Sequence, residues 1–98
     1  MIKKEGYEVE KKVVVKIIEK SLAEVKGVHS IQRGLWGKNI KIKELKEGME
    51  ISLGLIIKEG SVISQTVRDA QKKIKEEIEK TLEIPVKKVD IKIKGIKP

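Results

Sequence analysis

The sequence lacks cysteine and phenylalanine, and it has only one tryptophan, one tyrosine and one histidine. Without thiols the chain has no disulfide bond, no thiolate metal site and no cysteine nucleophile. With so few aromatic rings it also lacks a stacking platform for the bases of single-stranded nucleic acids. Its longest apolar runs, 13–15 and 55–57, are three residues each, whereas a membrane-spanning helix needs about 20. We therefore expect no transmembrane segment and, because the N-terminal residues do not read as a signal peptide, a cytoplasmic location.

Residues that could carry out catalysis are equally scarce. His29 is the only histidine, so a metal site built on two histidines is excluded, and its neighbour Ser30 is expected to point to the opposite face of a strand. The segment 34–37 is too short for a phosphate-binding loop and does not lead into a helix. Most acidic residues have a lysine nearby in the sequence, as on a solvated surface. We expect no enzymatic activity, no metal site and no cofactor.

What the chain has in abundance is lysine. Lysine plus arginine number 23 and aspartate plus glutamate 15, which gives a net charge of +8, and the only arginines are Arg33 and Arg68. Abundant lysine, glutamate and isoleucine is typical of thermophile proteins. With 98 residues the chain is expected to form a single domain over 1–98 with one modest core.

The spacing of apolar residues predicts two helices and four strands. Apolar residues recur every three or four positions over about 10–25 and 64–82, which predicts amphipathic helices, with Ser64 as the N-cap of the second. Alternation of apolar and polar residues, less regular in the first case, predicts strands over 28–33, 39–45, 49–58 and 88–94. The order α-β-β-β-α-β predicts an α+β two-layer sandwich, with both helices packed on one face of a four-stranded mixed sheet.

One polar residue stands inside an apolar stripe. At 100° per residue, Gln71 falls on the apolar side of the second helix. A buried amide without partners costs about 1–3 kcal/mol. We expect the Gln71 side chain to tie this helix to a loop or to the end of a strand.

Two surfaces are candidates for contact with a partner. In the turn from Arg33 to Lys38, Leu35 and Trp36 would form an apolar tip within a basic rim, unless the indole folds back over the core. The second surface is the uncovered face of the sheet around Gly54, because a glycine in mid-strand weakens the strand unless another backbone or a partner approaches. The residues assigned to partner binding are Arg33, Leu35, Trp36, Lys38, Ser52, Gly54, Ile56 and Arg68. We expect a protein partner, either a second copy of the chain or a membrane-anchored protein.

Five lysines of the predicted strands are expected to form one basic face: Lys41, Lys43, Lys88, Lys92 and Lys94. This face suggests an alternative function, salt-sensitive binding to nucleic acid through phosphates and without sequence preference. The scarcity of arginine and of aromatic residues argues against it, and a lysine-rich surface of the thermophile kind is the simpler interpretation. A third alternative is peripheral attachment to the inner face of an anionic membrane, helped by Trp36 and the basic C-terminal tail.

The order of these features resembles the alkaline shock and general stress (Gls-type) proteins of Gram-positive bacteria. The resemblance covers about residues 6–96, and the segments that carry it are 24–28 followed by 34–36, the strand 51–53, the pair 59–60 and the segment 89–95. The chain departs from the family in its positive charge and in Glu83, which stands where a glycine commonly follows the second helix. The resemblance implies a non-enzymatic adaptor or scaffold linked to cell-envelope homeostasis and to alkaline or general stress, acting through protein–protein contacts.

Overall fold

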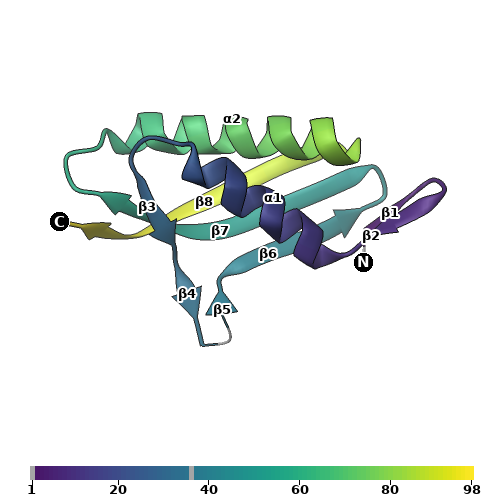
Figure 1. The fold of residues 1–98 in the computed structure, drawn as a ribbon, viewed down its shortest axis with the longest axis horizontal. Coiled ribbons are helices and arrows are strands. Elements are labelled where there is room, and N and C mark those ends of the chain that lie inside the picture. Colours follow the sequence, from purple (N-terminus) through teal and green to yellow (C-terminus); the bar gives the residue numbers. More distant parts are fainter. Residues whose placement is uncertain (1, 36) are drawn as a thin grey trace.

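The main sheet is built around one long strand, β7 (Gly48–Lys58), in the computed structural model, which describes residues 2–35 and 37–98. β8 (Val86–Lys97) runs parallel to β7 along almost its whole length. On the other side, β7 pairs with two antiparallel strands, first with β6 (Ile40–Leu45) and then with β3 (Val28–Ile31). The sheet is therefore four-stranded and mixed, with β3 and β6 placed end to end along the same edge of β7 (Figure 1).

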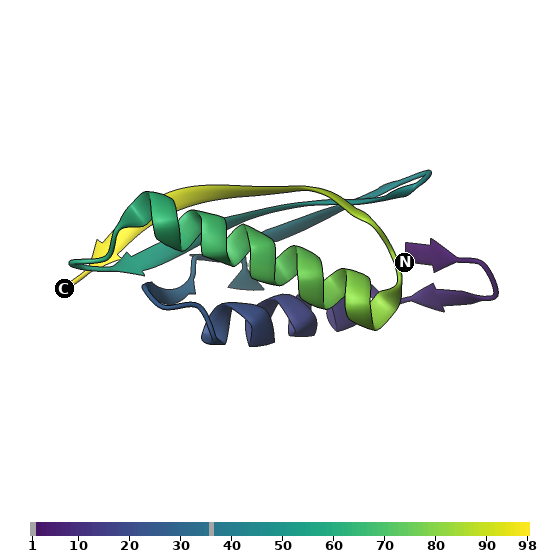
Figure 2. The ribbon, with the colours of Figure 1, turned by 90° about the horizontal axis from the view of Figure 1, so that it is seen from above.

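Both helices lie on the same side of this sheet, as Figure 2 shows. α1 (Lys11–Ala23) packs beside β3, and α2 (Ile63–Leu82) packs on β8 and against α1. An ion pair of 3.0 Å between Lys73 Nζ and Glu24 Oε2 joins α2 to the end of α1, and its hydrogen bond raises the pKa of Lys73. The predicted α+β class, with two helices on one face of a mixed sheet, is confirmed.

Two short hairpins are added to the predicted order of elements. β1 (Ile2–Lys4) pairs with β2 (Tyr7–Val9), and β4 (Arg33–Gly34) pairs with β5 (Gly37–Lys38). The first hairpin is attached to the body of the protein by the Tyr7 hydroxyl, which donates a hydrogen bond of 2.9 Å to the carbonyl oxygen of Leu82. The second hairpin projects from the sheet edge between β3 and β6 (Figure 1).

The core lies between the helices and the inward side of β7. Alternate residues of this strand are almost completely buried, as the sequence predicts: Ile51, Leu53, Leu55 and Ile57. They meet the buried faces of the two helices, which consist of Val14, Ile18 and Leu22 on α1 and Ala70, Ile74 and Ile78 on α2. The outermost residues of the two predicted stripes, Val13 and Ile63, remain exposed. Burial is thus concentrated where the helices cross the centre of the sheet.

The predicted role of Gln71 is confirmed, whereas the predicted cap of α2 is wrong. Gln71 Nε2 donates a hydrogen bond of 3.0 Å to the carbonyl oxygen of Val89, which ties α2 to β8. The helix begins at Ile63, so Val62 occupies the N-cap position and makes no side-chain capping bond. Ser64 lies within the first turn, because the chain turns sharply at 59–60 and enters the helix earlier than the polar residue suggests.

The connection from α2 to β8 is held by a small polar cluster. Glu83 ends the helix in the left-handed conformation (φ 57°), which favours glycine. Glu79 Oε2 accepts hydrogen bonds of 2.8 Å from Lys75 Nζ and from the backbone N–H of Val86. Lys75 Nζ also donates to the carbonyl oxygen of Val86 at 3.1 Å, so one ion pair satisfies both backbone groups at the start of β8.

Replacing Glu83 by glycine is expected to stabilise the protein. A non-glycine residue in the left-handed region costs about 1–2 kcal/mol of stability, which glycine avoids. Glycine also makes the unfolded chain more flexible, and this cancels part of the gain. We expect Glu83→Gly to raise the free energy of unfolding by about 0.5–1 kcal/mol in urea titrations. Glu76→Gly, in the middle of the same helix, is the matched control and should lower it by about 1 kcal/mol. A loss of stability in both variants would contradict the assigned backbone conformation.

The Glu79 carboxylate should make the stability of the protein dependent on pH. Its hydrogen bonds with Lys75 and Val86 lower the pKa of Glu79 below the ordinary value of 4.5. A carboxylate whose pKa is lowered on folding contributes stability above its unfolded pKa, and this contribution is lost as the pH falls through the folded pKa. We therefore expect Glu79→Gln to melt below wild type at pH 7, with the difference shrinking below about pH 4.5 and vanishing once the pH has fallen through the lowered pKa of the folded state. The control Glu76→Gln removes a carboxylate 4.0 Å from its lysine and should show a smaller difference at pH 7.

Candidate functional surfaces

The open face of the sheet carries the basic residues that the alternation predicts. Because the helices cover only one side, every second residue of β6, β7 and β8 points away from the core. Register places Lys43 and Lys88 on either side of Glu50, and it places Lys41 and Asp90 on either side of Ser52. One step further along, Lys92 lies beside Gly54, and the bulge that follows adds Lys94 at the same edge. The structure thus brings all five predicted lysines onto one face, which we call the lysine face.

None of the cations of the lysine face has an ion-pair partner among residues 2–35 and 37–98. Five ion pairs are found in the part of the chain that the structure describes, and their lysines are Lys12, Lys38, Lys72, Lys73 and Lys75. None of these lysines belongs to the lysine face, although Glu50 and Asp90 lie on it. Four of the eight helix lysines thus have a carboxylate partner, whereas none of the five lysines of the lysine face has one.

Two adjoining hollows lie on the lysine face and share Lys41 and Ser52. One, of about 190 Å³, is lined by Asn39, Lys41, Ser52, Leu53, Gly54, Lys92 and Lys94. The other, of about 200 Å³, includes both carboxylates of the face and is lined by Lys41, Ile42, Lys43, Glu50, Ile51, Ser52, Lys88 and Asp90. The first hollow contains three lysines and no acidic residue, and we call it the lysine hollow.

Gly54 forms the floor of the lysine hollow rather than the flat exposed spot expected around it. Its backbone is buried, and a Cβ atom placed there would lie 2.8 Å from both Gln32 Oε1 and Lys94 Cγ. The neighbouring Ser52 and Ile56 point to the same side and are half-buried. A larger residue at position 54 would have to displace the two side chains that lie over the glycine. The partner role expected for these residues stays a prediction.

The β4–β5 hairpin carries the second predicted surface. At its base, Gln32 N donates to the Gly54 carbonyl at 2.9 Å, and Asn39 N donates to the Gln32 carbonyl at 2.8 Å. Leu35 at the tip is 88% exposed, the largest exposed fraction among the big apolar side chains that the structure describes. The expected contribution of Trp36 lies outside the described residues. Lys38 is not a free cation, because it forms an ion pair with Glu19 of α1.

His29 and Ser30 are closer together than expected. The register shifts between Val28 and Ser30, and this irregularity brings His29 Nδ1 to 3.0 Å from Ser30 Oγ, so the expectation of opposite faces is wrong. Both the hydrogen bond and the imidazole are exposed to solvent. No carboxylate in 2–35 or 37–98 orients the ring, so the pair lacks the third group that makes a histidine an effective base for a serine.

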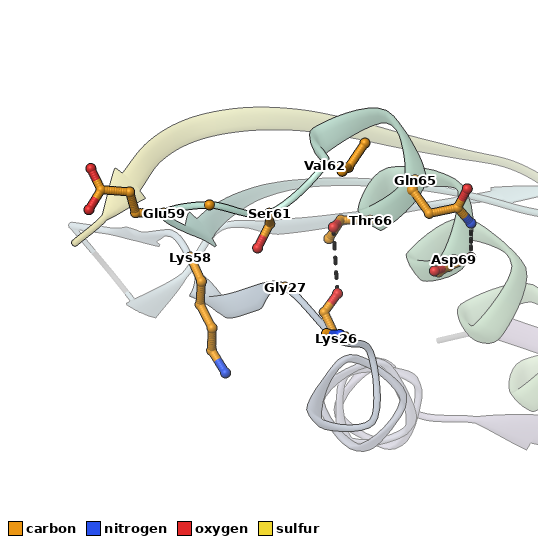
Figure 3. Close-up of a pocket in the computed structure, with 10 residues that line it drawn as sticks. Lys26, Gly27, Lys58, Glu59, Ser61, Val62, Gln65, Thr66 and Asp69 are labelled. Atoms are coloured by element: carbon orange, nitrogen blue, oxygen red, sulfur yellow. Dashed lines mark hydrogen bonds between the residues drawn. The ribbon is translucent and has the colours of Figure 1, made fainter.

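A more voluminous hollow than the two on the lysine face was not indicated by the sequence. It has a volume of about 540 Å³ and lies between the α1–β3 turn and the start of α2 (Figure 3). Thr66 Oγ1 donates to the Lys26 carbonyl at 3.5 Å, and Gln65 Nε2 donates to Asp69 Oδ1 at 2.7 Å. Side-chain polar atoms buried in the described part of the chain all have partners, so no unpaired group marks a ligand here.

The remaining predicted residue, Arg68, lies apart from both surfaces. It is exposed on α2, in the layer opposite the lysine face, and its guanidinium donates to Gln65 Oε1 at 3.1 Å. Across residues 2–35 and 37–98, no three histidine, cysteine, aspartate or glutamate side chains cluster in a way that could hold a metal ion. Nor does either of the described helices combine the length and apolar character required to cross a bilayer.

The model of one protein family matches almost the whole chain, over residues 2–98. The chain belongs to the alkaline shock protein 23 family, which is described by a cell-envelope-related function. This confirms the resemblance seen in the sequence and connects the protein to the cell envelope. A search of curated proteins gives no match.

Solved structures similar to this chain share its fold at very low sequence identity. A structure of the MamM C-terminal domain has 7% identity and a TM-score of 0.59, with 88% of this chain and 99% of that one covered. A zinc form of a variant of that domain has 8% identity and a TM-score of 0.59, covering 89% and 87%. A manganese form of another variant has 8% identity and a TM-score of 0.58, covering 88% and 99%. At such identity the likeness concerns the fold alone.

The unpaired lysines predict an unusual response of stability to salt. Lysines gathered on one face repel one another, and screening by salt reduces the repulsion. We expect the double variant Lys41→Gln, Lys92→Gln to unfold at low salt with a free energy equal to wild type or higher by about 0.2–0.5 kcal/mol. Added salt should stabilise this variant less than it stabilises wild type.

The comparison for this prediction is Lys38→Gln, which removes the partner of Glu19. This substitution should lower the free energy of unfolding by up to about 1 kcal/mol, the contribution of a typical exposed ion pair. If the double variant lost as much stability as Lys38→Gln, measured by urea unfolding, the lysines of the face would be paired in solution.

Proposed function

We propose that this protein is a non-enzymatic adaptor of the cell envelope, which works from the cytoplasmic side through contacts with other proteins. The observation that carries the proposal is the family match over residues 2–98, since that family has a cell-envelope-related function. The chemistry of the surface agrees with it. The described residues offer a solvent-exposed histidine–serine pair without a third group, and two exposed surfaces that are suited to binding.

The β4–β5 hairpin is the proposed docking element for the protein partner. Leu35 stands at the tip of a narrow projection, so a partner can surround it and remove most of its apolar surface from water. Arg33 beside it is exposed and adds a positive charge to the rim. A partner anchored in the envelope would hold the protein at the inner face of the membrane.

Affinity capture after chemical cross-linking in the native cells tests the adaptor role. Wild type should recover envelope proteins, and Leu35→Ser should recover about tenfold less of them, because the central apolar contact of an interface typically contributes 2 kcal/mol or more. Val62→Ser is the matched control, since Val62 is 68% exposed in a different part of the surface.

The possible outcomes distinguish the adaptor role from docking through the β4–β5 hairpin. Recovery of envelope proteins by wild type, Val62→Ser and Leu35→Ser alike would contradict docking through the hairpin. Recovery of no envelope protein by wild type would contradict the adaptor role itself.

A further inference from the structure

We propose that the lysine face binds an extended acidic segment of a partner protein, whose carboxylates enter the lysine hollow between β6 and β8. The inference rests on the proposed adaptor function and assigns it a second surface, on the side of the sheet that the helices leave open. It is carried by the geometry of the hollow, by the absence of partners for its lysines and by the carboxylates placed next to it.

The lysine hollow has the form of a site for a carboxylate. Lys41 comes from β6 and Lys92 from β8, so the two ammonium groups approach from opposite sides of β7. The floor between them is made of the small residues Ser52 and Gly54, and Lys94 closes one side. A negatively charged group seated there is approached by three ammonium groups, and no acidic residue lines the hollow.

Within the described part of the chain, these lysines form no ion pair. Elsewhere on the described surface, glutamates of this chain lie beside lysines, as in the pair of Lys75 with Glu79 at 2.8 Å. On the lysine face the cations have no such partner within 4.0 Å, and no acidic residue lines the lysine hollow. A binding surface explains this arrangement, because the missing countercharge is then supplied by the ligand.

The adjoining hollow favours a protein segment over a nucleic acid. Glu50 and Asp90 lie between lysines there, and they would repel the uniform row of phosphates of a nucleic acid. A protein segment can place a basic or neutral residue opposite each of these carboxylates. Half-buried Ile56, on the same face of β7, also offers an apolar contact that a side chain can use and a phosphate backbone cannot.

The charge pattern also disfavours a second copy of the chain as the occupant. In a symmetric dimer the same patch would meet itself across the interface. Five lysines would then face five lysines, with only two carboxylates on each side to compensate them. The occupant must instead carry an excess of negative charge, and an extended segment matches the elongated course of the two hollows along β7.

The test is a fluorescence anisotropy titration of the full chain with a labelled peptide in which three aspartates alternate with serine and a neutral run of serine follows, so that no carboxylate has to lie opposite Glu50 and Asp90. Such a peptide in extended form repeats its carboxylates about every 6.7 Å, which matches every second residue of a strand. At low salt, wild type should bind it, and the variant Lys41→Gln, Lys92→Gln should bind at least about tenfold more weakly, because each lost contact with a charged partner contributes on the order of 1 kcal/mol. Thermal melting establishes that each variant is folded.

The matched control removes two positive charges from the opposite layer. Lys16 and Lys20 are exposed on α1, and Lys16→Gln, Lys20→Gln should change peptide affinity by less than about twofold. Equal weakening in both double variants would show attraction by net charge alone and would overturn the proposal. Failure of wild type to bind the peptide would overturn it as well.

A labelled single-stranded oligonucleotide of the same charge forms the third arm. It should bind wild type more weakly than the peptide does; tighter binding that depends on Lys41 and Lys92 would overturn the proposal and identify a nucleic-acid surface. The variant Leu35→Ser should bind the peptide as wild type does. If wild type failed to bind the peptide but still captured envelope proteins, this inference alone would be rejected. If wild type captured no envelope proteins, the adaptor function would be rejected.

Discussion

The structure depends on the burial of one strand from one side. The inward residues of β7 are shielded by two helices, and each buried aliphatic side chain contributes about 1.5–3 kcal/mol relative to exposure. The two helices of the described chain cover only one face of the sheet, so the residues of the other face must be compatible with water. The same alternation that places isoleucine and leucine inside therefore places lysine, serine and glycine outside. The core and the lysine face are two consequences of one pattern.

Much of the fold follows from the sequence because burial dictates periodicity. The stripe of α2 and the alternation of β7 are visible in the order of residues, and Gln71 could be assigned to a structural bond because an amide in that stripe needs an acceptor. The hairpins were missed because each strand in them has only two or three residues, too few to show a period. The irregular alternation of apolar and polar residues around His29 also has a physical cause. The register of β3 shifts there, and the side chains of two neighbouring residues come together.

The residues of the candidate surfaces could be predicted from the sequence, but whether their charges are paired could not. Alternation alone places Lys41 and Lys92 on the outward face. Whether a lysine forms an ion pair depends on which residues lie next to it in the folded protein. The ion pair of Lys38 with Glu19, which is distant in the sequence, therefore could not be predicted. Gly54 marked a close approach correctly, but only the structure shows that the approaching groups are side chains of the same protein, from Gln32 and Lys94. The 540 Å³ hollow at the start of α2 arises from two turns that meet, and no local pattern announces it.

The β4–β5 hairpin leaves the sheet edge after Gln32, which bonds to Gly54, and the edge resumes at Ile40, which pairs with Leu53, the adjacent residue of β7. The edge is continuous across this excursion, so the register of β7 with β3 and β6 does not depend on what the excursion contains. Lengthening such a loop costs only about 0.6 kcal/mol for each doubling. Proteins with this architecture can therefore exchange or extend the projecting segment while the scaffold stays the same, which makes it a natural position for diversity among paralogues and for the insertion of a reporter tag.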